Sequence, residues 1–490
     1  MKILYAAGEA SPFAKTGGLA DVAGSLPQAL NRKGIDCRVV IPLYDVIPYD
    51  MRQNMRFISN FYIRTANRAQ YCGIFESEHD GAVYYFIDNE GYFKRGAVFG
   101  EYDDAERFAF FSRAVLEMLP HIDFKPDIIN ANDWHTALIP IYKHVLYPNS
   151  RYYSDIKTIF TIHNIAFQGK YNFDIFDYVF GLPHEAGGLV EYDGYINLMK
   201  GAIEASHSVT AVSPNYVKEI SGNHSDTSGY DFGWGLTPFI NYKFSKFTGI
   251  LNGVDMNSIN PSSDNDIYRT YDINTVHEGK KENKLNLQEE LGLEQNPEVP
   301  LIGIVTRIDN GQKGCELIIE ALANGLLKKN DAQLVILGSA AKGDYAGRQM
   351  EDSFNYFAGL HKGKMAAYIG YDAKLAKKIY AASDIYLMPS RYEPCGLSQI
   401  MALKYGTVPV VRETGGLADT VTDNKHMEGN GFVFKNYSHK ELISAVKRAL
   451  SEYTNSESWH KLIERAMGCD YSWDSGSVNK YIDLYTSLIL

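Results

Sequence analysis

Cysteine is scarce in this 490-residue sequence, and the motifs of common metal and nucleophile sites are absent. The five cysteines are odd in number, scattered and without a CxxC pair, which argues against a disulfide framework or a structural zinc site. HExxH, GxSxG and GxxxxGK[ST] do not occur, so nothing indicates a zinc protease, an α/β-hydrolase or a P-loop enzyme. We therefore expect no metal site, no disulfide and a reducing compartment.

One acidic motif has the carboxylate spacing of a metal–diphosphate site. It is DND at 264–266, and it lies in a polar stretch rather than directly after a predicted strand. We therefore interpret the motif as part of a solvated loop.

Long basic runs and long apolar runs are also missing. The formal net charge is −11 and no extended Lys/Arg run is present, which disfavours binding to nucleic acid or to an anionic membrane. No window of about 18 apolar residues exists, and the apolar opening MKILYAA is too short for a signal peptide. We expect a soluble cytoplasmic protein that acts on a small molecule or a neutral polymer. Homo-oligomerisation is left open.

What is present has the composition of a large globular protein. With 45% hydrophobic and 22% charged residues, the chain can bury a sizeable core, and its length favours two domains. Short β-branched runs alternate with longer periodic segments, as in parallel strands joined by helices. A polar stretch from Val254 to about Val299 predicts an interdomain passage with one helix at LNLQEELGL. We predict two doubly wound α/β domains. Their strands are expected at KILYAA, CRVVI, VYYFID, DIIN, TIFTI, SVTAV and FTGIL, and then at LIGIVT, AQLVILG, MAAYIG, DIYLMP and VPVVR.

The hexapeptide TGGLAD occurs twice, in KTGGLADV at 15–22 and in ETGGLADT at 413–420. Each copy follows a predicted strand and leads into a predicted helix, the first over about 21–31. Glycines let backbone N–H groups approach an anion, and a helix N-terminus carries about half a positive charge. A single copy is more often an ordinary strand-to-helix turn. Two copies at equivalent corners of two domains favour facing walls of one cleft.

Three charged residues follow strands of the second series. Arg307 and Lys313 in RIDNGQK come after LIGIVT, where two cations would stabilise a leaving diphosphate; the alternative is a solvated basic loop. Glu393 comes after DIYLMP, and a helix is expected to begin near Cys395. The Glu393 carboxylate would accept two sugar hydroxyl groups, or alternatively serve as a partner of the helix dipole.

Polar residues also follow two strands of the first series. His163 and Asn164 come after TIFTI, and Asp133 and His135 come after DIIN. A lone histidine is more often a hydrogen-bonded structural residue. That alternative is stronger for His135 than for His163, whose loop holds other polar side chains.

Seven motifs together resemble the bacterial glycogen synthase and plant starch synthase family from Lys2 to about Trp473. The resemblance implies the α/β glycosyltransferase-B fold, with two doubly wound Rossmann-like domains that face a central cleft. It implies domains over 1–251 and 252–473, and a helix over about 474–490 that crosses back to the first domain. The implied reaction transfers glucose from ADP-glucose to the non-reducing end of an α-1,4-glucan, with retention at the anomeric carbon and without a metal or cofactor. The motifs are KTGGLADV, DWHTAL, HNIAFQG, LNGVD, RIDNGQK, SRYEPCGL and TGGLADTV.

The resemblance also implies roles for individual residues. Lys15 would face the donor phosphates, and the His163 backbone carbonyl would steady positive charge on the transferred glucose. Arg307 and Lys313 would clamp the diphosphate, and Glu393 would line the glucose pocket. The implied catalytic residues are therefore Lys15, His163, Arg307, Lys313 and Glu393. The implied substrate-binding residues are Gly17, Gly18, Asp21, Asp133, His135, Asn164, Tyr371, Cys395, Gly396, Thr414 and Gly415.

The resemblance sorts the substrate-binding residues by what they would contact. Tyr371 would stack on the nucleobase, and Thr414 and Gly415 would donate to the distal phosphate. Asp133 and His135 would lie on the acceptor side.

Two departures from the family pattern leave alternatives open. Five residues, rather than the usual four, separate Arg307 from Lys313, so the loop carries an extra residue. Met401 stands where related families place a second glutamate for the ribose, which leaves the nucleotide unassigned. The first alternative is a UDP-glucose enzyme of the same fold with a small acceptor. The second is a catalytically silent glucan-binding protein, which the presence of Lys15, Arg307 and Glu393 disfavours.

Overall fold

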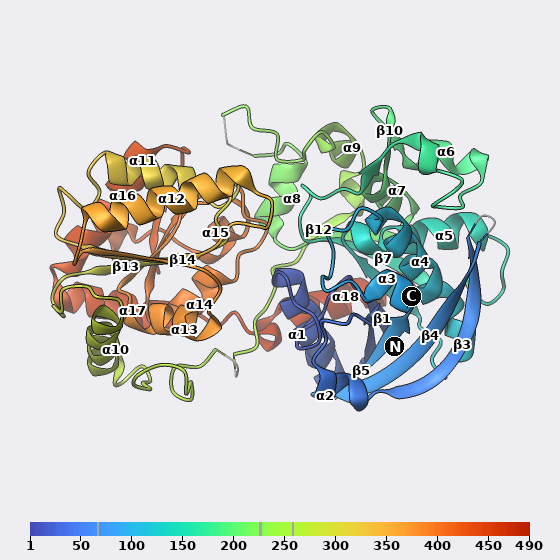
Figure 1. Ribbon diagram of the computed structural model, residues 1–490, viewed down its shortest axis with the longest axis horizontal. Helices are drawn as coiled ribbons and strands as arrows, with labels where there is room; N and C mark the ends of the chain where they lie inside the picture. The colour runs from blue at the N-terminus through green and yellow to red at the C-terminus, as the bar shows by residue number, and fades with distance from the viewer. Residues whose placement is uncertain (66–67, 225–227, 257–258) are drawn as a thin grey trace. The chain divides into compact units, whose positions relative to one another are not determined.

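The computed structural model describes the chain outside residues 66–67, 225–227 and 257–258 (Figure 1). The chain forms two compact units, and each has its own largely parallel sheet with helices packed on it. Unit 1 comprises Met1–Asn223, Asp231–Val254 and Ser472–Leu490, and unit 2 comprises His224–Tyr230 and Asp255–Tyr471.

The nine-stranded sheet of unit 1 has the order β12-β11-β7-β6-β1-β2-β5-β4-β3. The seven strands from β12 to β5 are mutually parallel, and they confirm the seven predicted strands of the first series. In six of them most side chains are buried, as expected of central parallel strands, whereas the three residues of β12 are not buried. The seven are β1 (Lys2–Ala6), β2 (Asp36–Pro42), β5 (Ala82–Asp88), β6 (Ile128–Asn132), β7 (Lys157–Ile162), β11 (Ser208–Ala211) and β12 (Phe247–Gly249).

Two further strands extend this sheet and were not predicted. β3 (Arg56–Thr65) and β4 (Arg68–His79) form an antiparallel hairpin, and β4 pairs with β5. Only three of the twelve β4 residues are buried, and the strand lacks a long apolar run. A hairpin at the edge of a sheet needs fewer apolar residues than a central parallel strand.

The longer helices of unit 1 bury apolar side chains. In the first of them, α1 (Gly18–Arg32), the buried Leu19, Val22, Leu26 and Leu30 recur at helical spacing. No helix in the described part of the chain has both the length and the apolar sequence needed to cross a membrane. The other helices are α2 (Tyr49–Gln53), α3 (Glu90–Phe93), α4 (Asp104–Glu117), α5 (Leu138–Leu146), α6 (Gly187–Val190), α7 (Leu198–Ala205), α8 (Pro214–Ile220), α9 (Thr237–Tyr242) and α18 (Ser477–Ile489). A small second sheet contains β8 (Lys170–Tyr171), β9 (Glu191–Tyr192) and β10 (Tyr195–Asn197).

The sheet of unit 2 is entirely parallel and has the order β15-β14-β13-β16-β17-β18. Numbered within the unit this is 3-2-1-4-5-6, the order of the dinucleotide-binding Rossmann fold. The first five strands confirm the predicted second series, whereas the three-residue β18 was not predicted. The strands are β13 (Leu301–Val305), β14 (Gln333–Gly338), β15 (Met365–Ile369), β16 (Ile385–Met388), β17 (Val408–Arg412) and β18 (Phe432–Phe434).

Helices cover both faces of this second sheet. Figure 1 shows α11, α12 and α16 on one face and α10, α13, α14 and α17 on the other. The helices are α10 (Val276–Glu290), α11 (Cys315–Ala323), α12 (Tyr345–Leu360), α13 (Ala373–Ala382), α14 (Ser398–Lys404), α15 (Gly415–Thr420), α16 (His439–Tyr453) and α17 (Ser456–Met467).

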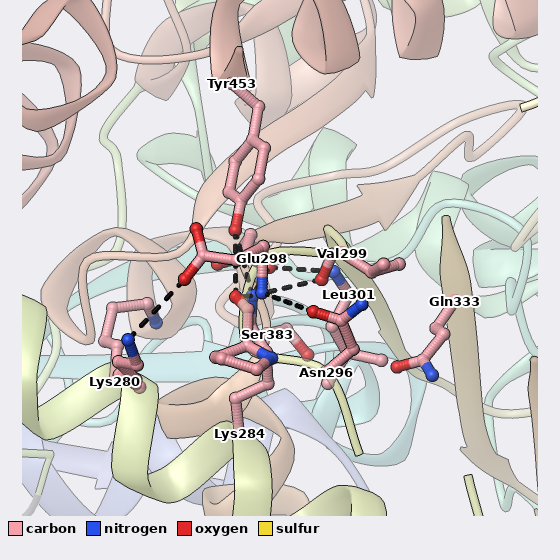
Figure 2. Close-up of polar contacts among 12 residues, drawn as sticks. Lys280, Lys284, Asn296, Glu298, Val299, Leu301, Gln333, Ser383 and Tyr453 are labelled. Atoms are coloured by element: carbon pink, nitrogen blue, oxygen red, sulfur yellow. Dashed lines mark hydrogen bonds and ion pairs between the residues drawn. The ribbon is translucent and has the colours of Figure 1, made fainter. Parts of the chain in front are cut away.

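Polar side chains attach α10 to the rest of unit 2 (Figure 2). The Lys284 ammonium group lies 2.7 Å from the Asp384 carboxylate and donates to the Val299 carbonyl at 3.1 Å and to the Tyr453 hydroxyl at 3.0 Å. One turn away, the buried Lys280 donates to the Ala381 and Tyr405 carbonyls. The prediction of an interdomain passage with a helix only at LNLQEELGL is therefore wrong in extent, because the helix begins at Val276 and two of its lysines, Lys280 and Lys284, are buried.

The DND motif is also less solvated than predicted. Asp264 is buried, and its carboxylate accepts from the Tyr405 hydroxyl and from Lys377 at 3.2 Å. Asp266 accepts from the same Lys377 at 2.9 Å. The motif therefore ties the chain before α10 to α13, and the earlier interpretation as solvated loop is wrong for Asp264.

Candidate functional site

Most of the predicted site residues follow strands at, or next to, the point where the strand order of each sheet reverses. In unit 2 the reversal lies between β13 and β16, and in unit 1 it lies between β1 and β6. Chains leaving two such strands turn to opposite sides, which opens a crevice at their carboxyl ends where ligands bind in α/β proteins. Each unit therefore has one edge at which a binding site is expected.

In unit 2 the two chains leaving this edge bring Lys313 and Glu393 together. The Lys313 ammonium group lies 2.7 Å from Glu393 Oε2, which also accepts from the Ser390 hydroxyl at 3.0 Å. Both side chains are largely buried, and only 5% of the Glu393 surface is exposed. Asp309 accepts from the Gln312 and Lys313 N–H groups at 3.0 Å, which fixes the turn that carries the lysine. The extra residue in the loop therefore does not remove Lys313 from Glu393.

Arg307 lies at the start of the same loop and remains accessible. Its guanidinium group donates to Gln312 Oε1 at 2.8 Å and lies 3.4 Å from the Asp309 carboxylate, while 56% of the side chain is exposed. Gly314 ends the loop with φ 73°, and a Cβ there would lie 2.3 Å from the Pro389 carbonyl. Only glycine permits this approach of the loop to the chain that leaves β16.

The second TGGLAD copy packs directly behind Glu393. The Gly416 N–H donates to the Glu393 carbonyl at 3.0 Å, and a Cβ on Gly416 would lie 2.0 Å from the Cys395 carbonyl. Gly415 has φ 43°, and Thr414 is fully buried with its N–H bonded to the Arg412 carbonyl at 2.9 Å. The second copy is therefore a buried support of the Glu393 turn, and the N–H groups of Thr414 and Gly416 already have partners inside the unit.

The predicted helix start near Cys395 is wrong by three residues. Gly396 has φ 73°, outside the right-handed helical region, so α14 begins only at Ser398. Cys395 is buried beside this turn, and Gln399 donates to the Cys395 and Gly396 carbonyls at 3.1 and 2.9 Å. These contacts place the Cys395–Gly396 turn between Glu393 and the Gly416 backbone.

Tyr371 differs from the other predicted residues of unit 2. It follows β15, two strands away from the reversal point, and 85% of its surface is exposed. The next residue, Asp372, caps α13 by accepting from the Lys374 and Leu375 N–H groups. The backbone at Tyr371 is therefore fixed while its ring is accessible.

In unit 1 the first TGGLAD copy has a different conformation from the second. Helix α1 begins at Gly18, one position later in the motif than α15, and Gly17 has an extended backbone with φ −153°. The nearest atom to a Cβ on Gly17 would be 3.6 Å away, and both Gly17 and Gly18 are exposed. The two copies thus share a sequence but not a structure: a Cβ fits at Gly17 of the first copy but not at Gly416 of the second.

Glu9 and Lys15 both precede this first TGGLAD copy in the chain. The Lys15 ammonium group forms an exposed ion pair with Asp21 at 2.6 Å. The Glu9 side chain is buried, and its carboxylate accepts from both the Thr16 N–H and the Thr16 hydroxyl. Burial raises the pKa of Glu9, although these hydrogen bonds oppose the increase. Glu9 therefore shapes the loop that presents Lys15.

Asp133 connects the chains that leave β6 and β7. Its Oδ1 accepts from the His163 N–H at 2.8 Å and from the Asn164 N–H at 3.3 Å. Burial, with a smaller contribution from the nearby Glu9, raises the pKa of the Asp133 carboxyl to about 7, although these two hydrogen bonds oppose the increase. Its φ of 56° is unusual for a residue with a side chain, and such strain is often found at functional sites.

The His163 ring is neutral and its tautomer is determined by its neighbour. Nε2 lies 2.9 Å from Asn132 Oδ1, and the amide nitrogen of Asn132 donates to the Ala6 and Asn130 carbonyls. Because Asn132 thus offers only an acceptor, the ring proton is on Nε2. Burial lowers the pKa of His163 to about 3, so the ring stays uncharged at neutral pH.

His135 lies in an aromatic environment. Its ring contacts Trp134 at 4.3 Å and Phe108 at 4.6 Å between centroids, and burial lowers its pKa to about 3. Nδ1 is buried without a hydrogen-bond partner among the residues that the structure describes. The ring also leaves little room for a side chain at position 8, because a Cβ on Gly8 would lie 3.1 Å from it.

Three residues at these edges were not predicted. Glu9 lies between β1 and the first TGGLAD copy, Asn132 ends β6, and Ser390 precedes Glu393. All three are polar residues at or just after strand ends, in segments already singled out by sequence. Their hydrogen bonds to Thr16, His163 and Glu393 depend on the fold and have no separate signal in the sequence. Within the described residues, no group of three or more His, Cys, Asp or Glu side chains is arranged to hold a metal ion.

Two family models match the chain. The starch synthase catalytic domain matches residues 2–241, and glycosyl transferases group 1 matches residues 288–467. Glycogen synthases of Clostridium perfringens and Geobacillus stearothermophilus are 45% and 43% identical to it. Both alignments cover 100% of this chain and 98% of the relative.

Solved structures give the same result for the fold. The catalytic domain of starch synthase IV from Arabidopsis thaliana, bound to ADP and acarbose, is 34% identical with a TM-score of 0.89 over 100% of this chain and 99% of that one. Sucrose-phosphate synthase from Thermosynechococcus elongatus is 16% identical with a TM-score of 0.62 over 99% of this chain and 98% of that one. Two α/β units with parallel sheets therefore form a glycosyltransferase-B type of fold, as the sequence implied.

Proposed function

Because the chain belongs to the glycogen synthase family of glycosyltransferases, we propose that it transfers glucose from ADP-glucose to the non-reducing end of an α-1,4-glucan, with retention at the anomeric carbon. Full-length identity to glycogen synthases supports the glucan acceptor. The starch synthase IV domain, which is described as bound to ADP and acarbose, supports an adenine nucleotide and an α-glucan as ligands.

The observation that carries this proposal is the Lys313–Glu393 pair beside Arg307 at the strand reversal of unit 2. Transfer of glucose from a nucleotide diphosphate leaves negative charge on the diphosphate as the glycosidic bond breaks. Arg307 and Lys313 supply two fixed cations for this charge, and one such group is commonly worth roughly 10² to 10³ in rate. Glu393 keeps Lys313 in place and offers a carboxylate to the sugar hydroxyl groups.

The residues of unit 1 are proposed to act on the same substrate classes. Lys15 would contact donor phosphate, since its ion pair with Asp21 is exposed and easily exchanged. The His163 carbonyl would face the transferred glucose, where a neutral dipole stabilises developing positive charge without forming a fixed ion pair. Asp133 holds the His163 and Asn164 backbone, so we assign it a positioning role in place of direct acceptor contact.

Nucleobase recognition is proposed for Tyr371, whose exposed ring can stack on adenine. Met401 offers no hydrogen bond to a ribose, so the choice of ADP over UDP depends on other contacts. We further propose that no metal or cofactor is required, because two cationic side chains are available to neutralise the diphosphate. Undiminished activity in EDTA is the expected result.

A donor comparison tests the proposal. Glycogen is incubated with ADP-glucose or UDP-glucose carrying radioactive glucose, and the labelled polymer is digested with an α-1,4-specific amylase. We expect much faster incorporation from ADP-glucose, and release of all label by the amylase, because retention produces only α-linkages. Preferred use of UDP-glucose would favour the alternative enzyme, and nucleotide-sugar binding with no incorporation would favour a silent glucan binder.

A further inference from the structure

A hollow of about 410 Å³ lies at the amino-terminal ends of strands in the unit 1 sheet, whereas the candidate site lies at their carboxyl ends. It is lined by the last turn of α5, the chain that enters β7 and the end of α7, including Lys143, Thr158, Ser206 and His207. Lys157 begins β7 and His163 follows its end, so the two regions are separated by a strand of roughly 20 Å. The proposed reaction uses none of these residues. The volume is within the usual range for small-molecule sites, about 300 to 1,000 Å³.

The hollow concentrates positive charge. The pKa of Lys143 is lowered mainly by burial and to a smaller extent by the positive charge of Lys157. The pKa of His207 is lowered to about 4, mainly by burial and to a smaller extent by the charges of Lys143, Lys157 and Lys246. Neither the Lys143 nor the Lys157 ammonium group forms a hydrogen bond or ion pair with any residue that the structure describes. Asp155 is the acidic group whose charge offsets that of Lys143.

Lys246 differs from the other two lysines. It donates to the Ile203, Glu204 and Ser206 carbonyls at the end of α7, so its charge serves that helix terminus. Its presence explains part of the repulsion but leaves Lys143 and Lys157 without a structural partner. Like charges held together without partners are unfavourable unless an anion joins them.

Directional donors accompany this charge. His207 Nδ1 accepts from the Thr158 N–H at 3.1 Å, and since an amide N–H can only donate, the ring proton is on Nε2. The neutral ring is therefore fixed as a donor. The Ser206 hydroxyl, which is buried in the wall of the hollow, has no hydrogen-bond partner among the described residues. The Tyr147 ring and Pro140 add an apolar wall on which a sugar ring can pack.

We propose that this hollow binds a phosphorylated monosaccharide, whose phosphate contacts the lining residues Lys143, His207 (through Nε2–H) and Ser206 (through its hydroxyl), with Lys157 as a neighbouring positive charge. A phosphate monoester carries nearly two negative charges and three acceptor oxygens, which matches two ammonium groups and two directional donors. The sugar contacts the Tyr147 side of the hollow. This site is separate from the proposed reaction and does not depend on it.

Isothermal titration of the full chain with fructose 6-phosphate, inorganic phosphate and fructose tests the proposal. The variant Lys143→Met/Lys157→Met removes both charges but keeps most of the side-chain volume. Lys218→Met is the matched control, because Lys218 is an exposed lysine on α8 of the same unit. We expect the wild type and the control to bind fructose 6-phosphate alike. The double variant should bind it at least about tenfold more weakly, which corresponds to about 1.4 kcal/mol.

The three ligands separate the sources of binding energy. Inorganic phosphate should compete with fructose 6-phosphate but bind more weakly, and fructose should not bind measurably. Equal affinity in the double variant and the control would place the ligand elsewhere and overturn the proposal. Fructose that binds as tightly as fructose 6-phosphate would also overturn it. So would the absence of heat from fructose 6-phosphate at concentrations up to about 10 mM, because a Kd above this concentration is too weak for a specific site.

Discussion

At the scale of single residues, the contact between Lys313 and Glu393 allows a chemical role of Lys313 to be distinguished from a structural one. Removing Lys313 leaves a buried carboxylate without its ion-pair partner, which destabilises a protein even when no reaction is involved. We expect Lys313→Met to reduce kcat by about 10² to 10³ and also to lower Tm. In Lys313→Met/Glu393→Gln neither charge remains, so Tm should recover while kcat stays low.

Steady-state kinetics and thermal unfolding of both variants measure this difference. Lys447→Met provides the control, because Lys447 is an exposed lysine of α16 in the same unit. If kcat recovered together with Tm in the double variant, Lys313 would be a structural residue and the proposed clamp would consist of Arg307 alone.

Asp133 predicts a pH effect on stability. Its folded-state pKa of about 7 lies above its ordinary value of 3.8, so between these values the folded chain binds more protons than the unfolded chain. Stability must therefore fall as pH rises through this window. Asp133→Asn keeps an oxygen to accept from the His163 and Asn164 N–H groups but cannot ionise. We expect its Tm to fall less than that of wild type between pH 5 and pH 8, and parallel Tm curves would contradict the assignment.

The candidate residues of each unit were easier to predict from the sequence than the contacts that they make within that unit. Arg307, Lys313, Glu393, Asp133 and His163 could each be placed after a strand, because apolar runs mark strands well. Their pairing could not be derived, since β13 and β16 are neighbours in space but are separated by two strands in the chain. Glu9 was overlooked because its partner is a Thr16 N–H group, and backbone partners have no sequence signature.

At the scale of elements, the two TGGLAD copies show that one peptide can be shaped by its surroundings. Gly416 approaches the Cys395 carbonyl so closely that a Cβ would lie 2.0 Å from it, whereas a Cβ on Gly17 meets nothing closer than 3.6 Å. We expect Gly416→Ala to displace the Cys395 turn, lower Tm by several degrees and reduce kcat. Gly17→Ala should leave Tm nearly unchanged. Unfolding and kinetic measurements on both variants check this, and equal effects on Tm would contradict the structural difference between the copies.

Helix α10 makes a second prediction at this scale. Lys284 is buried, paired with Asp384 and bonded to the Pro297 and Val299 carbonyls, whereas Lys281 on the same helix is exposed and 3.5 Å from Glu298. Lys284→Met leaves the Asp384 charge and two carbonyls without this partner, and we expect a loss of about 3 to 5 kcal/mol. Lys281→Met should cost less than about 1 kcal/mol. Denaturant unfolding measures both, and similar losses would show that α10 is held by apolar contacts alone.

The same helix illustrates a limit of prediction from sequence. Polar residues such as Lys280, Asn283 and Lys284 indicate solvent exposure when read alone, yet here each is buried against backbone carbonyls. The hairpin of β3 and β4 escaped prediction for a related reason, because one exposed face removes the apolar run that identifies a buried strand. Burial through hydrogen bonds is a property of the folded surroundings and is not visible in residue type.

At the scale of the whole molecule, the chain ends in the unit where it began. After α17 the segment from Ser472 onward belongs to unit 1, where the Tyr485 hydroxyl donates to Asn130 on β6 at 3.0 Å and Asp474 pairs with Arg32 of α1 at 3.1 Å. Unit 1 is therefore incomplete until the last residues of the chain have been added. Trp473 is the first large side chain of this returning segment, and substituting it tests whether the segment belongs to unit 1.

Trp473 is buried against the Gly253 backbone, and its indole N–H donates to the Ser25 hydroxyl of α1 at 2.8 Å. Truncating a buried tryptophan commonly costs about 3 to 5 kcal/mol, and here the loss should fall on unit 1 although the residue follows the whole of unit 2 in sequence. We expect Trp473→Ala to increase hydrogen exchange in α1, β6 and α18 while α10 to α17 remain protected. Trp459→Ala is the matched control, because Trp459 is buried on α17 beside Tyr453 and should increase exchange in unit 2 instead. Since Trp459 and Trp473 are close neighbours in sequence, exchange that rose in the same segments for both variants would contradict the assignment of the final residues to unit 1.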